Sequence, residues 1–220
     1  MLSEPTLTSR VEDGWDIPLL VWRTDGPLRA ISSGPLGGGL GVRRWVLNAT
    51  VPMSYDRDDP AGHLAALAAD LDLDGPGVGL LTGVDVTEVV TRTDAGVRAW
   101  ATVGLGTPVP AAVPAPAALT QQVGTVNIVV YVPARLADSA LVNAVATATE
   151  AKSQAIMELG LSGTGTPTDA VTVLCPVDGP EARYGGPRSA WGAPLAWAVH
   201  AAVLTGGDRP VLPWSDRLNG

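Results

Sequence analysis

A strand–helix–strand pattern in the second half of the chain is the feature that most constrains the fold. Two continuous apolar runs, residues 125–132 and 170–175, are typical of buried strands, and residues 138–159 between them have helical periodicity. A connection of this length joins parallel strands in a βαβ unit. Continuous apolar strands also indicate a sheet that is covered on both faces. The pattern therefore predicts an α/β fold with some α+β character.

The remaining segments predict a mixed β-sheet with flanking helices, in which the βαβ unit is C-terminal. The 220 residues suffice for one hydrophobic core, so we expect a single domain over residues 1–220 with loose ends at about 1–12 and 207–220. A helix is predicted after Asp59-Pro60, a pair that favours helix initiation. That helix covers residues 61–71, and another helix is predicted at residues 191–204. Further strands are predicted at residues 18–22, 44–51, 78–84 and 97–105.

Lys152 is the only lysine in the chain, and its position within the predicted helix 138–159 is unusual. At helical spacing it falls inside the apolar stripe formed by Leu141, Val145, Ala148, Ile156 and Leu159. A buried ammonium needs a partner or loses its proton, and groups held in this way are candidates for binding or chemistry. Two structural interpretations stay open, because the stem can lie along apolar surface with its head in water, or the charge can form a structural ion pair.

The predicted βαβ unit also brings polar residues together. The start of its first strand, the end of its helix and the loop before its second strand share one edge of the sheet, because the helix runs antiparallel to both strands. This edge collects Gly124, Thr125, Asn127, Lys152 and the loop SGTGTPTD at residues 162–169. The hydroxyls and backbone N–H groups of the loop are suited to holding a carbonyl oxygen. On composition alone, however, the loop is an ordinary turn.

Other polar residues carry weaker signals. Residues 160–164 miss the nucleophile-elbow pattern and follow a helix, which argues against an ordinary hydrolase triad. Cys175 ends an apolar strand and is expected to be an inert buried thiol. His200, in an apolar helix, is more typical of a satisfied core histidine, although a role in the site stays open, and His63 is expected to be solvated. No closely spaced set of metal ligands occurs, so we expect no metal.

Composition limits the partners. The net charge of -8 and a pI of about 4.6 argue against nucleic acid. No apolar stretch approaches the length that spans a bilayer, and no secretory signal is recognisable. A single cysteine fits a reducing cytoplasm. We therefore expect a cytoplasmic protein that binds a small molecule, without nucleic-acid or membrane partners. A homo-oligomer is compatible with the sequence.

Several motifs together resemble the adenosylcobinamide amidohydrolase family. The resemblance covers residues 31–206 in collinear order. Its most specific pieces are the helix ending TATEAK at Lys152 and the loop SGTGTPTD at residues 162–169. The motifs are ISSGPLGGGLG, NATVPMSYDRDDP, VGLLTGV, WATVGLGTP, GTVNIVVYV, LVNAVATATEAKSQA, SGTGTPTDAVTVLCP and YGGPRSAWGAPLAWAVHAAVL.

The resemblance implies hydrolysis of the amide that joins aminopropanol to the corrin ring of adenosylcobinamide. It would give adenosylcobyric acid and 1-amino-2-propanol, with the cobalt corrinoid as substrate and no separate cofactor. Amide hydrolysis needs a nucleophile, a proton carrier and oxyanion donors. The residues suggest Lys152 as proton shuttle or oxyanion donor, oriented by Asp169. The candidates for a hydroxyl that attacks or positions water are Ser162, Thr164 and Thr125, and those for substrate binding are Asn127, Asn143, Thr166, Gly163 and Gly165.

Two alternatives from other classes stay open. The same scaffold would suit a non-catalytic corrinoid-binding protein, in which the polar edge only binds its ligand. Alternatively, cleavage between Gly124 and Thr125 would expose an N-terminal threonine nucleophile. Release of free aminopropanol separates the first alternative from the enzyme, and the mass of the active polypeptide tests the second.

Overall fold

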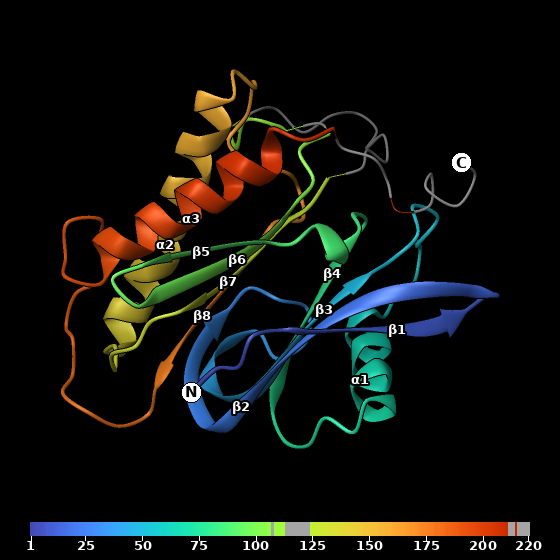
Figure 1. Ribbon diagram of the computed structural model, residues 1–220, viewed down its shortest axis with the longest axis horizontal. Helices are drawn as coiled ribbons and strands as arrows, with labels where there is room; N and C mark the ends of the chain where they lie inside the picture. The colour runs from blue at the N-terminus through green and yellow to red at the C-terminus, as the bar shows by residue number, and fades with distance from the viewer. Residues whose placement is uncertain (107, 113–123, 211–213, 215–220) are drawn as a thin grey trace.

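A single mixed sheet of eight strands forms the centre of the described part of the protein (Figure 1). The computed structural model describes residues 1–106, 108–112, 124–210 and 214. The strands are β1 Thr6–Glu12, β2 Trp15–Ser32, β3 Gly39–Thr50, β4 Gly77–Thr82, β5 Val90–Asp94, β6 Val97–Val103, β7 Val126–Tyr131 and β8 Ala170–Pro176. The helices are α1 Pro60–Asp70, α2 Asp138–Glu158 and α3 Gly192–Gly207, with a 3-10 turn, η1, at Val86–Glu88.

The order of the strands confirms the predicted fold class. The sheet runs β4-β3-β2-β8-β7-β6-β5, and β1 pairs with β2 beside this path. β7 and β8 are adjacent and parallel, with α2 as their connection, so the predicted βαβ unit is present. β3 and β4 are also parallel, and the other pairs are antiparallel, which makes the sheet mixed.

The sheet curls, so that its inner face is covered by the sheet itself. Val46 of β3 and Leu80 of β4 share one buried cluster with Trp100 of β6 and Val129 of β7, although neither β3 nor β4 is a neighbour of β6 or β7 in the sheet. The prediction that both faces of the sheet are covered is therefore confirmed, although the two faces are covered by different parts of the protein. Helices cover the outer face, and the opposite half of the sheet covers the inner one.

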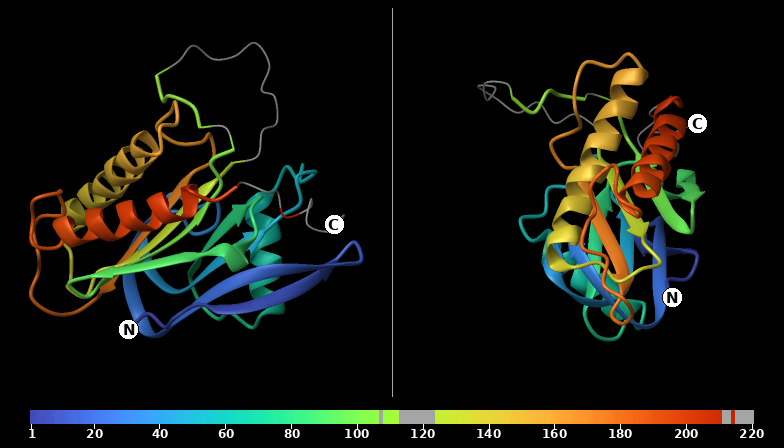
Figure 2. Two further views of the ribbon diagram at one scale, coloured as in Figure 1. Left: turned by 45° about the horizontal axis from the view of Figure 1, so that its top comes forward. Right: turned by 90° about the vertical axis from the view of Figure 1, so that its left-hand side faces the viewer.

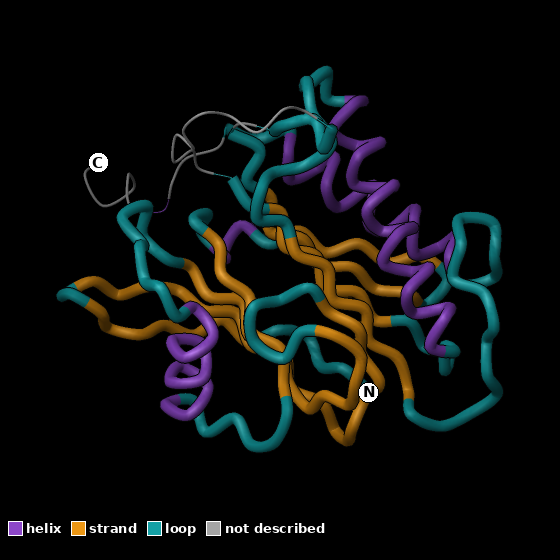
Figure 3. The backbone as a smooth tube through the Cα atoms, turned by 180° about the vertical axis from the view of Figure 1, so that it is seen from behind, coloured by secondary structure: helices purple, strands orange, loops and turns teal. Residues whose placement is uncertain are grey.

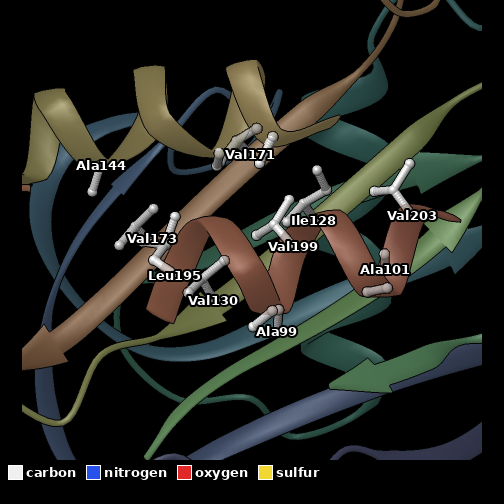
Figure 4. Packing of buried hydrophobic residues seen from close by; sticks show 14 of the residues in the cluster. Ala99, Ala101, Ile128, Val130, Ala144, Val171, Val173, Leu195, Val199 and Val203 are labelled. Atoms are coloured by element: carbon white, nitrogen blue, oxygen red, sulfur yellow. The ribbon is translucent and has the colours of Figure 1, made fainter. Parts of the chain in front are cut away.

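Two helical layers lie on the outer face. α2 and α3 lie side by side over β5 to β8, while α1 packs separately on β3 and β4 (Figures 2 and 3). Leu195, Val199 and Val203 of α3 recur at a spacing of four residues and face Ile128 and Val130 among the β-strand side chains (Figure 4). Alternation along β7 sends Val126, Ile128 and Val130 to this outer core and Asn127, Val129 and Tyr131 to the inner face.

The N-terminal residues correct one expectation. Residues 6–12, predicted to be loose, form β1 and pair with β2 along their whole length, and Leu2 is 1% exposed. The signal for this hairpin is Asp13-Gly14, because both residues have positive φ, as a two-residue hairpin turn requires. At the other end, Gly207 closes α3, and residues 211–213 and 215–220 lie outside the described residues.

Candidate active site

Lys152 points into the protein, as the helical spacing predicts. It is 6% exposed, and its ammonium donates to Oδ2 of Asp169. Asp169 accepts three further hydrogen bonds. Its Oδ1 accepts the backbone N–H of Val126 at 2.8 Å and the hydroxyl of Thr166 at 2.6 Å, and its Oδ2 accepts the backbone N–H of Thr166 at 3.0 Å. The carboxylate thus ties α2, the loop before β8 and the first residue of β7 together.

Glycines of the 162–169 loop have packing reasons to be glycine. A Cβ on Gly165 would overlap the Lys152 ammonium and Oδ2 of Asp169. A Cβ on Gly163 would lie 2.7 Å from the backbone nitrogen of Val109. The loop packs against the ion pair and residues 108–109, and this packing explains both glycines. The hydrogen bonds to Asp169 explain Thr166, so none of the three residues requires a ligand to explain its identity. Their predicted role in substrate binding stays a prediction.

Three predicted residues lie apart from this cluster. Ser162 and Thr164 are exposed, and the Thr164 hydroxyl accepts the backbone N–H of Ala111 at 3.0 Å. Asn143 is exposed nine residues before Lys152 on α2, which separates them by about 14 Å along the helix axis. The structure therefore does not bring Asn143 to the polar edge with Lys152. Asn143 was a candidate for its amide chemistry, a choice that took no account of its separation from Lys152 along the helix.

A cavity of about 370 Å³ opens at one end of the curled inner face, beside the polar edge. It lies where β3 and β4 end and where β7 and β8 begin, and the loops after β2 and β3 complete it. Two predicted site residues, Thr125 and Asn127, line it. The other described residues that line it are Ser33, Pro35, Val51, Tyr55, Pro60, Leu81, Thr82, Gly83, Thr168 and Ala170.

The predicted constellation is divided between the two faces of the sheet. Lys152 and Asp169 lie on the outer side with α2, whereas Thr125 and Asn127 line the inner cavity. Val126, which lies between Thr125 and Asn127 at the start of β7, connects the two groups because its backbone N–H donates to Asp169. One edge collects these residues, as predicted, but at that edge they lie on two opposite faces of the sheet. The period of two along β7 carries the signal that separates them.

Asn127 is held in one orientation at the cavity wall. It is 2% exposed, and its Nδ2 donates to Oδ1 of Asn48 and to the carbonyl of Leu81, both at 2.9 Å. Because both partners are acceptors, the amide nitrogen must face them. Oδ1 then has no hydrogen-bond partner among the described residues. Buried acceptors without a partner are rare and are typical of places where a ligand or water binds.

Thr125 lies beside a second hydroxyl. Its Oγ1 is 2.6 Å from Oγ1 of Thr168, and the Thr168 hydroxyl donates to the carbonyl of Gly124 at 3.2 Å. With that donation made, Thr125 is the donor between the two hydroxyls. The cavity therefore presents a short chain of oriented hydroxyls where β7 and β8 begin.

Tyr55 lines the cavity from the loop before α1, and sequence reasoning missed it. Nδ1 of His63 lies 3.2 Å from its hydroxyl, and the two rings stack with centroids 5.6 Å apart. His63 is 7% exposed, so the expectation that it is solvated was wrong. The signal was Asp59-Pro60, because Asp59 caps α1 by accepting the backbone N–H of Gly62 and so places His63 in the first turn, facing back to the loop.

Glu12 lies next to His63, near the ring nitrogen that does not contact Tyr55. Its Oε2 lies 3.7 Å from Nε2 of His63, and its two oxygens accept hydrogen bonds from Arg10 at 2.8 Å and Arg57 at 2.7 Å. Burial lowers the pKa of His63, and the nearby arginines add to this. Burial would raise the pKa of Glu12, but the hydrogen bond from Arg10 and the surrounding positive charges outweigh it and hold that pKa below its usual range. A neutral imidazole thus faces an ionised carboxylate.

The other reactive side chains lie elsewhere. Cys175 is buried and accepts the backbone N–H of Leu136 at 3.4 Å, and burial raises the pKa of its thiol, which fits an inert residue. His200 is half-buried beside Glu158, with Nε2 and Oε2 2.9 Å apart, in a groove between α2 and α3.

Within residues 1–106, 108–112, 124–210 and 214, no group of three His, Cys, Asp or Glu side chains is arranged to hold a metal ion. None of the described helices has the length and hydropathy needed to cross a membrane.

Comparison with known proteins assigns the chain to a family. A family model described as adenosylcobinamide amidohydrolase matches residues 4–211. An adenosylcobinamide amidohydrolase of Methanosarcina mazei is 30% identical over 190 residues, which cover 82% of this chain and 90% of that protein. A protein of Halobacterium salinarum with the same name is 38% identical over 132 residues, which cover 56% of this chain and 55% of that protein.

These matches define the class of the protein as a hydrolase that acts on an amide bond. The chain belongs to the adenosylcobinamide amidohydrolase family. The resemblance that the sequence motifs indicate is thereby confirmed.

Proposed function

We propose that this protein hydrolyses the amide between aminopropanol and the corrin ring of adenosylcobinamide. The products are adenosylcobyric acid and 1-amino-2-propanol, and the reaction serves corrinoid salvage. Membership of the family over residues 4–211 is the observation that carries this proposal.

The inner cavity is the proposed site for the reacting amide. At about 370 Å³ it suits one side arm of the substrate, so the macrocycle stays outside its mouth. Thr125 supplies a hydroxyl that attacks the carbonyl carbon or positions a water, and the unpartnered Oδ1 of Asn127 accepts a substrate N–H. Asp169 holds the Val126 backbone from the outer side, between these two residues.

Lys152 remains a proposed site residue, which acts on the cavity from the outer side through Asp169. The Lys152–Asp169 pair holds the backbone N–H of Val126, between the cavity-lining residues Thr125 and Asn127. Ser162 and Thr164 are the weaker candidates, because both are exposed on the outer side of the loop.

Incubation with adenosylcobinamide followed by an assay for free 1-amino-2-propanol tests the proposed function. We expect equal amounts of 1-amino-2-propanol and adenosylcobyric acid. Tight binding without release would instead favour the non-catalytic corrinoid-binding protein. An intact polypeptide mass in the active enzyme would exclude cleavage before Thr125.

We also propose that the cobalt corrinoid is only the substrate and that no resident metal or cofactor takes part. Activity that persists after dialysis against a strong chelator supports this, and activity that zinc or magnesium restores would contradict it. A cytoplasmic location and the absence of a nucleic-acid partner stay predictions from the composition, and a homo-oligomer stays open.

A further inference from the structure

Tyr55, His63 and Glu12 form a row that ends at the inner cavity. Tyr55 comes from the loop after β3, His63 from the first turn of α1 and Glu12 from the end of β1. Only Tyr55 lines the cavity, whereas His63 lies behind it with 5% of its side chain exposed. The row thus leads from a buried imidazole to a hydroxyl at the proposed substrate site.

One hydrogen bond and one nearby carboxylate charge orient the protons of this row. The Glu12 carboxylate favours the N–H tautomer at Nε2 of His63, 3.7 Å away. Nδ1 is then an acceptor, and the Tyr55 hydroxyl donates to it at 3.2 Å. This leaves the lone pairs of the Tyr55 oxygen free to accept, in a residue that lines the cavity. Tyr55 can therefore take a proton from a nucleophile as it passes its own proton to His63.

The surrounding charges suit this exchange. Arg10 of β1 and Arg57 of the loop donate to Glu12 and neutralise it. The same arginines act to lower the pKa of Tyr55, whereas Glu12 and Asp59 act to raise it. Burial and the two arginines lower the pKa of His63, so that the imidazole is neutral and able to accept a proton at pH 7. Burial raises the pKa of Tyr55, so that the hydroxyl keeps its proton until the exchange.

We propose that Tyr55 is the acid–base residue of the amide hydrolysis and that His63, backed by Glu12, acts through it. This inference rests on the proposed function, because it assumes that an amide is cleaved in the cavity. Tyr55 is the catalytic residue in this scheme. His63 and Glu12 are positioning residues that receive and return the proton through Tyr55.

The proton balance of the scheme is complete. As the nucleophile oxygen forms its bond to the carbonyl carbon, its proton moves to the Tyr55 oxygen and the Tyr55 proton moves to Nδ1 of His63. The imidazolium then faces the Glu12 carboxylate. When the carbon–nitrogen bond breaks, its electron pair goes to nitrogen, and the proton returns through Tyr55 to the leaving amine. A water attack gives the acid directly. For a Thr125 attack, the Thr125 proton first turns from Thr168 toward Tyr55; water then cleaves the resulting ester by the same exchange, and the proton returns to Oγ1 of Thr125.

Tyr55→Phe is the first test, because it removes only the hydroxyl and keeps the stacked ring. We expect kcat for 1-amino-2-propanol release to fall about 10²–10⁴-fold with KM nearly unchanged. Tyr184→Phe is the matched control, since Tyr184 is 74% exposed, and it should behave as wild type. Retention of kcat within about threefold in Tyr55→Phe would overturn the inference.

His63→Gln supplies a readout that a purely structural role would not move. Wild-type kcat should fall on the acid side of the ordinary histidine range, because the pKa of His63 is lowered in the folded protein and protonated His63 accepts no proton from Tyr55. The residual activity of His63→Gln should lack this acid limb, whereas His200→Gln should keep it. An unchanged acid limb in His63→Gln would overturn the inference, even if the variant is less stable.

The proposed function and the acid–base role of Tyr55 fail in different ways. If the wild-type protein releases no 1-amino-2-propanol, the proposed function fails and the role of Tyr55 falls with it. If the wild type is active and both Tyr55→Phe and His63→Gln keep its rate and pH profile, only the acid–base assignment fails.

Discussion

Lys152 and Asp169 form a buried ion pair that connects α2 to the loop before β8, and the Asp169 carboxylate also accepts the backbone N–H of Val126. The carboxylate has four donors from three segments of the chain. The pair is therefore a junction between the outer helix and the start of β7. Its contributions to folding and to catalysis are separable by experiment.

Lys152→Met should lower the free energy of unfolding by about 3–5 kcal/mol, because it leaves the Asp169 carboxylate buried without its counter-charge. Urea unfolding followed by circular dichroism measures this. Arg183→Met removes an exposed cation and should change stability by less than about 0.5 kcal/mol. Equal stability of Lys152→Met and wild type would show that the pair is dispensable for the fold.

Lys152→Arg tests the proposed catalytic role. Arginine keeps the positive charge but does not give up a proton near neutral pH. We expect turnover to be abolished while the far-ultraviolet circular dichroism spectrum stays that of the folded protein. Near-normal turnover would refute a proton-transfer role for Lys152 and leave it as a structural partner of Asp169.

Asn127→Ala and Asn143→Ala separate two residues that the sequence treats alike. Asn127 lies at the cavity wall with an unpartnered Oδ1, whereas Asn143 lies well toward the other end of α2. Loss of one hydrogen bond to the substrate should lower kcat/KM about 10–100-fold in Asn127→Ala. Asn143→Ala should retain wild-type kinetics. The reverse result would move the binding site to the outer surface of α2.

The sequence predicts the local features of this fold well and the long-range ones poorly. The inward direction of Lys152 follows from helical spacing alone, and the start of α1 follows from Asp59-Pro60, because both depend on neighbours in the chain. The curl of the sheet depends on how β4 meets β7, and no local pattern reports that. The row from Glu12 to Tyr55 needs the β1–β2 hairpin, whose Asp13-Gly14 turn was a readable signal that the polar composition of residues 1–12 obscured.

The low pKa of His63 predicts how stability depends on pH. Burial lowers this pKa in the folded state, so the unfolded chain binds the proton more readily. The stabilisation is therefore complete above about pH 6.5, the ordinary value, and is lost as the pH falls below it. Unfolding of wild type, His63→Gln and His200→Gln should be compared from pH 8 to pH 5. We expect His63→Gln to lose less stability over this range than the other two, and parallel losses would contradict the buried neutral imidazole.

The most direct test of the account is the rate of 1-amino-2-propanol release from adenosylcobinamide by wild type, Pro35→Trp and Pro187→Trp. Both prolines are exposed, but Pro35 lines the inner cavity and Pro187 lines the groove between α2 and α3. The account predicts release by wild type and by Pro187→Trp, and at least about a 100-fold loss in Pro35→Trp, in which the indole fills the space of the substrate amide. No release by the wild-type protein, or full activity with the cavity blocked, would contradict it.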